Sequence, residues 1–416
     1  MLVAHRKKMF LLCQMFPLPV QSGSQLRTFN LLVRFAQRFD VTFLTLAATP
    51  GWEAHLEELR RHCVRVIPVV PDNKRSRLHR AWFKALFWMR RLLFAESSDR
   101  FYNTMPAVNR AIRDALAAER FDVVFCEYWF WDPTLFEAAG LKVIDANDVQ
   151  SQRVEKLLER SRNPIERMQR RRLVRRYQQM EAAALARADV VIATTVRDRD
   201  VFERMAPGPE KIVLPTGLDT DYFVPQDTAP DERNVVFYGA LSNPMNRDAV
   251  QYLVRDILPR IRERVPGVRL TIVGAFPPPE VLDMARRDPL VTVTGYVEDV
   301  RQPLARAGVV VCPLRFGYGI RGRIFELLSM SIPVVATSVA VEGMELRSGD
   351  GLLLADEPAA FAAAVATLLE DATLRSDLAA RGRELAVGRM SIAVTYDRLA
   401  DLLDQRTTAQ PVPQSV

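Results

Sequence analysis

Cysteine and histidine are both scarce in this sequence, which contains only four residues of each type among 416. The cysteines are scattered, with no Cys-x-x-Cys pair and no histidine at metal-ligand spacing. This distribution excludes a disulfide framework and a zinc site of the usual kind, and it indicates a reducing compartment. Cys126 and Cys312 lie in apolar runs, where cysteine behaves as a small hydrophobic residue. We therefore expect no bound metal.

Long apolar runs are absent as well. No stretch approaches the roughly 18 consecutive apolar residues that a membrane-spanning helix requires. Residues 1–20 open with a basic patch followed by MFLLCQMF, but this apolar stretch is short and no A-x-A cleavage motif follows. We interpret it as a first buried strand rather than a signal peptide, and we expect a cytoplasmic protein.

The overall composition is that of a globular protein, with 49% hydrophobic and 26% charged residues. A chain of 416 residues is too long for one ordinary core and fits two domains. The formal net charge is +7, which favours an anionic partner. A nucleotide, an acidic lipid surface and a nucleic acid all meet that condition, and only the distribution of the charges separates them.

Apolar strand-like runs alternate with amphipathic helical patterns along the whole chain. In the first half we expect strands at 9–15, 41–46, 64–70, 121–126, 143–146 and 190–194. In the second half we expect them at 235–238, 269–273, 291–294, 309–312 and 334–337. Strand–helix alternation implies right-handed crossovers and parallel sheets. The pattern therefore predicts an α/β protein with two doubly wound, Rossmann-like domains.

A Pro- and Asp-rich stretch, PQDTAPDER, separates the two sets of strands, and we interpret it as a linker at 225–233. The first domain is then expected over 1–224 and the second over 234–388. Helical patterns occur at 361–369 and 391–403, and we expect a final helix over 389–405. The last residues, 406–416, have the composition of a disordered tail.

Two basic segments interrupt the alternation. In 73–94 (NKRSRLHRAWFKALFWMRRLLF), apolar residues recur at helical spacing and basic residues fill the gaps. This pattern fits an interfacial membrane helix, while an apolar face buried in the core is the alternative. The segment 153–187 contains an arginine cluster at 170–176 without interleaved aromatic residues, so we expect a long solvated helix and no nucleic-acid binding. An anionic membrane surface is a candidate partner for both segments.

The densest pattern is PLRFGYGIRGRIFELLSMSIPVVATSVAVEGME, residues 313–345. An apolar run leads into a loop with three glycines and three arginines, then a predicted helix and a further strand. Glycines let backbone N–H groups approach an anion, and arginines can fork onto phosphate oxygens at a helix start. Glu326 lies about one turn inside the helix, where a carboxylate can accept hydrogen bonds from a ribose diol. The stretch suits a nucleoside diphosphate, with an ordinary tight turn as the alternative.

Several segments in order resemble the retaining glycosyltransferases of family 4, which have the two-domain GT-B fold. The glycine-rich stretch resembles the family's donor-nucleotide segment, and LPTGLDTDYFVP (214–225) resembles its interdomain segment. NVVFYGALSNPMNRDAV (234–250) is similar to the strand–loop–helix that opens the second domain, and VTVTGYVEDV (291–300) to the tGxVxD stretch. The resemblance implies two domains that face a central cleft, with the last helix crossing back to the first domain.

The resemblance implies a nucleotide-sugar donor in the second domain and transfer without a metal or other cofactor. Arg321 and Arg323 would stabilise the leaving diphosphate, with plain surface solvation as the alternative. Glu326 matches the second glutamate of the family's E-x7-E motif, which is expected to hold the ribose. The other donor-binding candidates are five positions in matching loops and the turn after the 334–337 strand: Gly23, Gly239, Gly319, Glu342 and Gly343. Glu342 has a structural role as its alternative, and Gly343 is expected to supply φ > 0 or a close approach.

The sequence departs from the family at three donor-site positions. Tyr318 stands eight residues before Glu326, where the motif has its first glutamate. Ala240 and Met245 occupy the positions of the usual arginine and lysine, which leaves Arg247 as the nearest cation and a donor-binding candidate. The stretch 246–248 (Asn-Arg-Asp) then either forms a local substitute or simply opens the helix.

The first domain departs from the family too. Where many relatives have a histidine, FCEYWFWDP offers Glu127, a candidate catalytic residue whose alternative is an ordinary loop carboxylate. Asn147 and Asp148 replace a later His-Asp pair and are candidates for the acceptor side, although an Asx turn also explains Asp148. The histidines lie in the N-terminal segment or on expected helices, so any general base would be a carboxylate or the leaving phosphate.

The resemblance and the residues together predict a retaining glycosyltransferase of the hexosyltransferase type. Its partners would be a nucleotide sugar and a saccharide or lipid-linked saccharide acceptor in cell-surface polysaccharide or glycolipid synthesis. The missing glutamate and histidine leave a non-catalytic sugar-nucleotide-binding or scaffold protein as the main alternative. A sugar-nucleotide epimerase of the same fold, which would release free nucleotide without an acceptor, is a further alternative.

Overall fold

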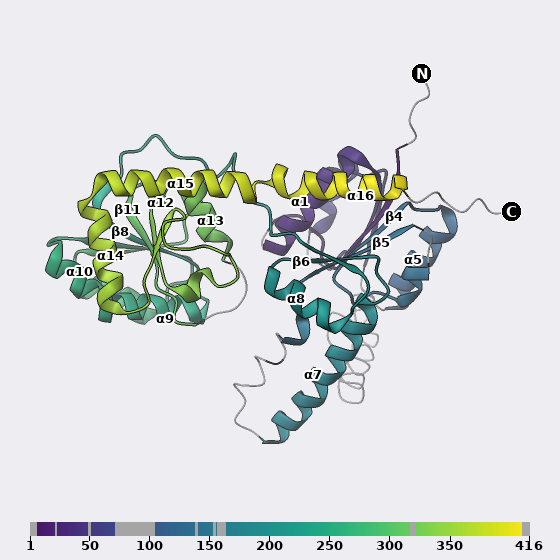
Figure 1. Ribbon diagram of the computed structural model, residues 1–416, viewed down its shortest axis with the longest axis horizontal. Coiled ribbons are helices and arrows are strands. Elements are labelled where there is room, and N and C mark those ends of the chain that lie inside the picture. The colour runs from purple at the N-terminus through teal and green to yellow at the C-terminus, as the bar shows by residue number, and fades with distance from the viewer. Residues whose placement is uncertain are drawn as a thin grey trace. The chain divides into compact units, whose positions relative to one another are not determined.

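The computed structural model describes residues 6–20, 23–48, 51–70, 105–137, 140–152, 155, 164–316 and 321–409 (Figure 1). Contacts divide the chain into two compact units. Unit 1 consists of Met1–Pro215 and Thr395–Val416, and unit 2 of Thr216–Val394. The amphipathic segment expected at 73–94 lies outside the described residues.

Unit 1 contains a seven-stranded sheet with the strand order β3-β2-β1-β4-β5-β6-β7, and every pair in it is parallel. Its strands are β1 (Lys8–Cys13), β2 (Asp40–Leu46), β3 (Arg65–Val69), β4 (Val123–Glu127), β5 (Leu141–Asn147), β6 (Val190–Ala193) and β7 (Glu210–Val213). The central strands are apolar at successive positions because helices cover both faces of the sheet. Met9, Phe10 and Leu11, for example, point alternately to opposite faces and are all buried.

The described helices of unit 1 connect these strands and complete their cover (Figure 1). They are α1 (Gly23–Arg38), α2 (Leu56–His62), α5 (Pro106–Ala118), α7 (Pro164–Leu185), α8 (Val196–Met205) and α16 (Arg398–Ala409), with short 3-10 turns at Trp52–His55 and Pro133–Glu137. The C-terminal α16 packs against α1, where Arg38 pairs with Asp401 at 2.8 Å. The last helix therefore returns to the first unit.

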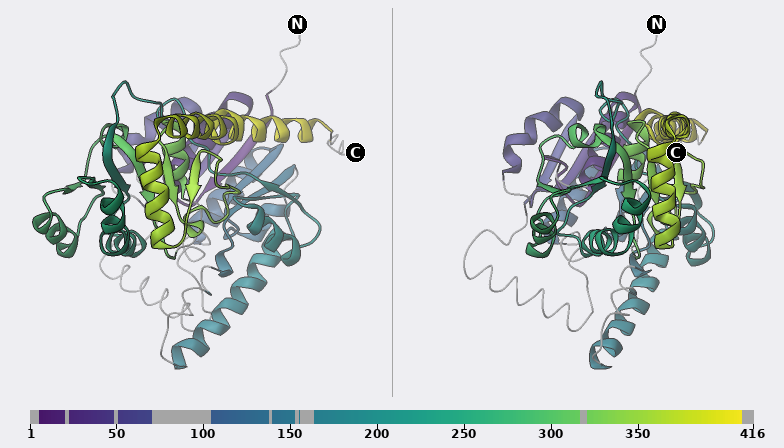
Figure 2. Two further views of the ribbon diagram at one scale, coloured as in Figure 1. Left: turned by 60° about the vertical axis from the view of Figure 1, so that its left-hand side comes forward. Right: turned by 90° about the vertical axis from the view of Figure 1, so that its left-hand side faces the viewer.

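Helix α7 has two different ends. Near its C-terminal end, the buried carboxylate of Glu181 accepts hydrogen bonds from Trp129 Nε1 (3.1 Å), the backbone N–H groups of Gln150 and Ser151, and the Ser151 hydroxyl (2.7 Å). Towards its N-terminal end the helix extends away from the sheet of unit 1 (Figure 2). In the middle of the helix, Arg171, Arg172, Arg175 and Arg176 are exposed, as expected for a solvated helix, while Val174 and Tyr177 are buried.

Unit 2 contains a six-stranded sheet with the order β10-β9-β8-β11-β12-β13, again with parallel pairs throughout. Its strands are β8 (Asp231–Tyr238), β9 (Arg269–Val273), β10 (Val291–Gly295), β11 (Ala307–Cys312), β12 (Val334–Ala336) and β13 (Leu352–Leu354). Its α-helices are α9 (Pro244–Tyr252), α10 (Leu258–Arg264), α11 (Pro279–Arg287), α12 (Arg301–Ala305), α13 (Gly322–Ser329), α14 (Pro358–Glu370) and α15 (Ala372–Met390). Shorter helical turns lie at Leu253–Ile257 and Ser338–Val341, and another at Ala393–Asp397 spans the boundary to unit 1.

The units differ in their limits from the domains that the sequence predicts. The chain enters unit 2 after Pro215 rather than after residue 224, because Phe223 packs on the core of unit 2 and its carbonyl accepts a hydrogen bond from Ser329 Oγ at 2.6 Å. The expected linker 225–233 also lies in unit 2, and its last three residues belong to β8. Likewise α16 continues to Ala409, so residues 406–409 are helical instead of part of a disordered tail.

Candidate functional site

A cavity of about 420 Å³ lies at the carboxyl ends of β8 and β11 in unit 2. These two strands are adjacent, but the chain proceeds from β8 to β9 and β10 on one side and returns to β11 on the other. Such a switch point leaves a crevice between the two outgoing loops, where ligands bind in open α/β sheets. Both loops and the start of α13 line the cavity, with Asn243, Met245, Asn246, Leu314, Arg321, Gly322 and Arg323.

Arg321 is the residue immediately before α13, and its side chain reaches into this cavity. It is only 8% exposed, although arginine is rarely buried without compensation. Burial lowers the pKa of Arg321, the neighbouring charge of Arg323 lowers it further, and Glu342 acts in the opposite direction. Two guanidinium groups therefore lie close together at this cavity, and that of Arg321 is largely removed from solvent. A bound anion would stabilise both of them.

Arg323, two residues further, donates to protein groups of the opposite loop. Its Nη1 donates to the carbonyl of Tyr238 at 3.0 Å, and its Nη2 to Asn246 Oδ1 at 2.8 Å. A Cβ atom at Gly239 would overlap Arg323 Nη1 and lie 2.8 Å from Asn246 Nδ2, so a side chain there would displace the ends of these two side chains. The buried Nε has no hydrogen-bond partner among the residues that the structure describes. Arg323 thus holds the loop after β8 against α13.

Glu326 lies one turn further along α13, partly buried, and receives a hydrogen bond from the Tyr238 hydroxyl. Burial raises the pKa of Glu326 to about 7, although Arg323 and Tyr238 both act to lower it. Within the described chain its Oε2 is buried and without a hydrogen-bond partner. An acceptor atom in that state is available to a hydroxyl donor of a ligand.

Arg247, the nearest cation in the matching segment, takes no part in lining the cavity. It is half-buried in α9, whereas its neighbour Asn246 does line the cavity. Asp248 forms an ion pair with Arg315, which lies over the ring of Tyr252. Within 246–248, Asn246 thus contacts Arg323 whereas Asp248 pairs with Arg315. The three residues do not act together as a substitute for the family's arginine and lysine.

Two further donor-site candidates follow β12, and a third belongs to the glycine-rich loop. Glu342 and Gly343 are exposed, and Gly343 has a φ of 82°, as expected for a glycine placed for a positive φ. Gly319 lies outside the described residues, as does Tyr318, which occupies the position of the missing first glutamate.

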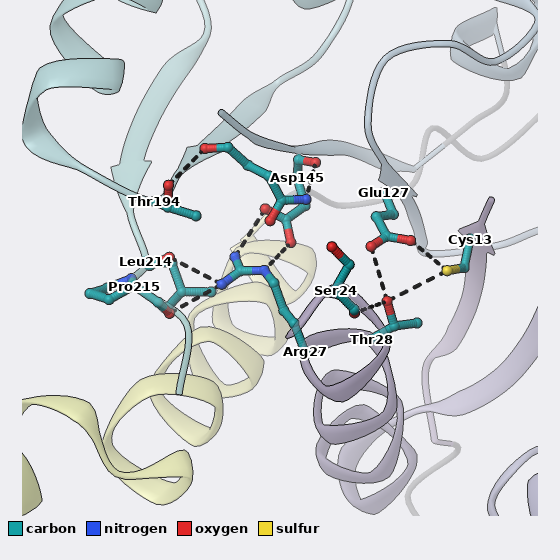
Figure 3. A network of polar contacts seen from close by, with 10 residues as sticks. Cys13, Ser24, Arg27, Thr28, Glu127, Asp145, Thr194, Leu214 and Pro215 are labelled. Carbon is teal, nitrogen blue, oxygen red and sulfur yellow. Dashed lines mark hydrogen bonds and ion pairs between the residues drawn. The ribbon is translucent and has the colours of Figure 1, made fainter. Parts of the chain in front are cut away.

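Unit 1 brings a second set of polar residues to the carboxyl ends of its central strands (Figure 3). Its switch point lies between β1 and β4, and these strands end at Cys13 and Glu127. The Cys13 thiol donates to Glu127 Oε2, and Thr28 Oγ1 on α1 donates to Oε1 at 3.0 Å. Burial raises the pKa of Glu127 to about 7, with a smaller contribution from Asp145, against hydrogen bonds that lower it. Both oxygens of this catalytic candidate are therefore occupied by protein groups.

Beside this cluster lies a buried ion pair that the sequence patterns do not single out. Arg27 of α1 donates from Nε and Nη2 to the two oxygens of Asp145 at the end of β5, at 2.9 and 3.0 Å (Figure 3). The two residues are 118 positions apart, and Arg27 lies in an ordinary amphipathic helical pattern. No local signal could have revealed this pair.

The candidates for the acceptor side follow directly after β5 or end it. Asn147 has a φ of 56° and its carbonyl accepts hydrogen bonds from the backbone and hydroxyl of Thr194, both at 3.0 Å. Asp148 accepts from the side chain of Gln150 at 2.5 Å, whereas the backbone N–H of Gln150 donates to Glu181. An Asx turn at Asp148, the alternative, would need that backbone donor. Gly23 is the first residue of α1.

Metal-binding clusters and membrane-spanning helices are both missing from the described ranges. These ranges contain no group of three or more His, Cys, Asp or Glu side chains placed to hold a metal ion. Within the same part of the chain, none of the helices combines the length and apolar character needed to cross a bilayer.

Two doubly wound parallel sheets in succession, with the last helix returned to the first unit, define the fold class as GT-B, as the sequence predicts. HepE of Anabaena, solved in complex with UDP, matches with a TM-score of 0.64 at 15% identity and covers 96% of this chain and 100% of its own. Sucrose-phosphate synthase of Thermosynechococcus elongatus matches at 0.65 and 17% identity, with 97% and 100% covered. At these identities the likeness shows the fold.

Within this class, residues 232–371 of unit 2 match the family model described as Glycosyl transferases group 1. This match confirms the resemblance that the motifs of unit 2 indicate at the level of glycosyl transferases group 1. The GDP-mannose-dependent alpha-(1-6)-phosphatidylinositol monomannoside mannosyltransferase of Mycolicibacterium smegmatis is 29% identical over 248 residues. The match spans 54% of this chain and 64% of that relative's length.

Proposed function

We propose that this protein is a retaining glycosyltransferase that takes its sugar from a nucleotide donor held in the cavity of unit 2. The observation that carries the proposal is the pair of neighbouring guanidinium groups, Arg321 and Arg323, at the switch point between β8 and β11. Fixed positive charge at a largely buried position stabilises the negative charge that builds on a leaving diphosphate. Charge from guanidinium groups and a helix start also allows the reaction to proceed without a metal ion.

In this proposal the two arginines have separate roles. Arg321, whose pKa is lowered by burial, contacts the diphosphate, while Arg323 positions the β8 loop through Tyr238 and Asn246. Glu326 accepts hydrogen bonds from the ribose hydroxyls through its Oε2. Gly239 keeps that loop close to the arginine pair.

The acceptor is assigned to unit 1. We place a saccharide, free or attached to a lipid, at the carboxyl ends of β4 and β5, near Glu127, Asn147 and Asp148. Because Thr28 and Cys13 occupy both oxygens of Glu127, this carboxyl group is better suited to positioning than to removing a proton from the acceptor. The base is then the leaving phosphate itself. The relative from Mycolicibacterium smegmatis, named for transfer of mannose to a phosphatidylinositol mannoside, supports a lipid-linked acceptor.

A transfer assay tests the proposal directly. GDP-mannose and UDP-glucose are the first donors to try, because the names of the relative and of the UDP-glucose complex of HepE mention them. We expect release of nucleoside diphosphate that depends on an added saccharide or glycolipid acceptor, and an α-linked product by NMR. Addition of EDTA should leave the rate unchanged.

Different results would point to the alternatives. Release of free nucleotide without any acceptor, together with sugar isomerisation, would indicate an epimerase. Nucleotide binding without turnover for any donor and acceptor would indicate a non-catalytic relative. A β-linked product would contradict the retaining mechanism, and loss of activity in EDTA would contradict transfer without a metal.

The same proposal includes a peripheral position on the cytoplasmic face of a membrane. Helix α7 carries four exposed arginines, Arg171, Arg172, Arg175 and Arg176. A cluster of this kind attracts anionic headgroups, and a lipid-linked acceptor would be found at such a surface.

A further inference from the structure

The chain passes between the two units twice, after Pro215 and after Val394. Within unit 2 the two passages are joined to each other. Leu218 donates its backbone N–H to the carbonyl of Met390, and its carbonyl accepts from Ile392 at 3.0 Å. Leu218 and Ser391 thereby form a parallel bridge. Within unit 2, the two segments that connect the units are therefore hydrogen-bonded to each other.

Within unit 1 a single side chain contacts both passages. Arg27 Nη1 donates to the carbonyls of Leu214 and Pro215, at 3.3 and 3.1 Å, which are the last residues before the first passage (Figure 3). The same guanidinium group lies 5.9 Å from the centre of the Tyr396 ring, just after the second passage. Tyr396 is fully buried, so this contact is shielded from solvent.

Arg27 is itself held rigidly. Its side chain is 3% exposed, and Asp145, with none of its side chain exposed, accepts two hydrogen bonds from it in a fork. A buried ion pair gives little net stability over apolar residues of the same volume, so its value lies in fixing one geometry. A planar guanidinium can donate to Asp145 and to both carbonyls at once, whereas a lysine ammonium cannot match that fork.

This ion pair is continuous with the polar cluster at the carboxyl ends of the unit 1 strands. Thr28, the next residue on α1, donates to Glu127 at the end of β4, and Asp145 lies opposite Glu127 on the neighbouring strand β5. The same turn of α1 therefore joins the strand ends to the two passages. Glu127 and Asp145 lie where the acceptor is assigned.

We propose that Arg27 is a positioning residue that anchors both passages between the units to the strand ends of unit 1. Nucleotide binding in unit 2 does not need this anchor. Turnover does, because the reaction requires groups from both units. This second part rests on the proposed glycosyltransferase function, whereas the anchoring itself does not.

Hydrogen–deuterium exchange of the full chain without ligand tests the anchoring. In Arg27→Lys we expect about tenfold faster exchange in peptides covering 213–219 and 391–398. The first peptide loses hydrogen bonds from a charged group to two of its carbonyls, and the second loses the guanidinium group beside the Tyr396 ring. The matched control is Arg38→Lys, the same change on the same helix, where the arginine pairs with Asp401 on α16 and touches neither passage. Arg34 is unsuitable as a control because it pairs with Asp397, next to the second passage.

A second variant separates the two contacts. Tyr396→Leu removes the ring and leaves the fork to Asp145 and the two carbonyls in place. Exchange should therefore rise more in 391–398 than in 213–219, where Leu218 shares hydrogen bonds with the second passage. Should Arg27→Lys fail to fold, the double variant Arg27→Met/Asp145→Leu removes both charges together and is measured in the same way.

Equal exchange in Arg27→Lys and Arg38→Lys at both passages would overturn the proposal. A uniform increase over all of unit 1 would also overturn it, since that result indicates general loss of stability. In turnover, we expect Arg27→Lys to lower kcat about tenfold or more at unchanged affinity for UDP or GDP. If the wild type binds neither nucleotide and transfers no sugar, the proposed function fails, but the exchange result still decides the role of Arg27.

Discussion

The contact between Gly239 and Arg323 is a sensitive point of the candidate donor site. Any side chain at position 239 would overlap the guanidinium group that holds the β8 loop through Tyr238 and Asn246. We expect Gly239→Ala to weaken nucleotide binding at least tenfold and to destabilise unit 2 by about 1–3 kcal/mol. The measurements are a nucleotide titration and a denaturant unfolding curve.

Gly388→Ala provides the control for this change. Gly388 lies in α15, a Cβ atom added to it would meet no other atom within 4 Å, and its φ is not positive. Alanine there should leave binding unchanged and stability equal or slightly higher. Similar losses in both variants would show that the Gly239 contact has no special role.

Two carboxyl groups with raised pKa values, Glu127 and Glu326, make the stability of the protein depend on pH. Burial raises the pKa of both Glu127 and Glu326 from 4.5 to about 7. Between these values the folded protein keeps protons that the unfolded chain has released, so the free energy of unfolding falls as pH rises. Each group contributes at most about 1.4 kcal/mol per pH unit.

Neutral glutamine resembles the protonated form, so Glu127→Gln/Glu326→Gln should flatten this fall between about pH 5 and 7. Urea unfolding at several pH values measures the slope, with the exposed Glu57→Gln as control. A double variant with the wild-type slope would show that neither group titrates in this range.

The site residues that sequence could predict are those encoded locally. Arg321, Arg323 and Glu326 lie within six positions and meet at one cavity or beside it, because a strand–loop–helix brings such neighbours together. Arg27 and Asp145 could not be found in this way, because 118 residues separate them. Each residue alone lies in an ordinary sequence pattern, Arg27 in an amphipathic helix and Asp145 in a strand. The different roles of Arg321 and Arg323 also depend on long-range contacts.

At the scale of elements, one buried carboxylate contributes to the attachment of helix α7, beside the apolar packing of residues such as Tyr177. Glu181 accepts hydrogen bonds from Trp129, Gln150 and Ser151 in a buried setting. Glutamine at this position would present an amide N–H₂ group to donors, so we expect Glu181→Gln to destabilise the protein by about 2–3 kcal/mol. Thermal unfolding checks this, and the exposed Glu57→Gln should change stability by less than about 0.5 kcal/mol. An equal effect of the two changes would contradict the attachment.

The central strands can be predicted from sequence, whereas the short outer ones cannot. Buried parallel strands are apolar at successive positions, so runs such as VVFC and GVVVC stand out in the sequence. The edge strands β7 (EKIV) and β13 (LLL) have only four and three residues, and the sequence pattern predicts no strand at either place. Their pairing is decided by the neighbouring strand in the folded sheet, which the local sequence does not contain.

For the whole molecule, the division into two units is visible in the sequence, but its limits are not. The Pro- and Asp-rich stretch after residue 224 has the composition of a linker, yet contacts of Phe223 and Leu218 place the preceding residues in unit 2. The amino-acid composition of a stretch indicates whether it is exposed to solvent. Whether it belongs to one unit or the other depends on its tertiary contacts. The return of the last helix to unit 1 is expected from the family resemblance rather than from any local pattern.

The net positive charge of the whole molecule predicts that the protein binds to anionic membranes. Vesicles that contain anionic phospholipid should co-sediment with the protein, and binding should weaken as salt increases. Arg171→Gln/Arg172→Gln on α7 should reduce binding several-fold, while Arg110→Gln/Arg113→Gln on α5, also exposed, should have a smaller effect. Equal effects would indicate that only net charge matters. Binding to neutral vesicles alone would contradict the proposal.

The central claim is that unit 2 binds a nucleoside diphosphate between Arg321 and Glu326. A thermal-shift titration with UDP, GDP and their sugars tests it, because a ligand that binds only the folded state raises its stability. We expect one nucleotide to stabilise the wild type and the exposed control Arg286→Ala equally, and Arg321→Ala and Glu326→Ala to lose most of the shift. An unchanged shift in both variants, or no shift with any nucleotide at millimolar concentration, would contradict the claim.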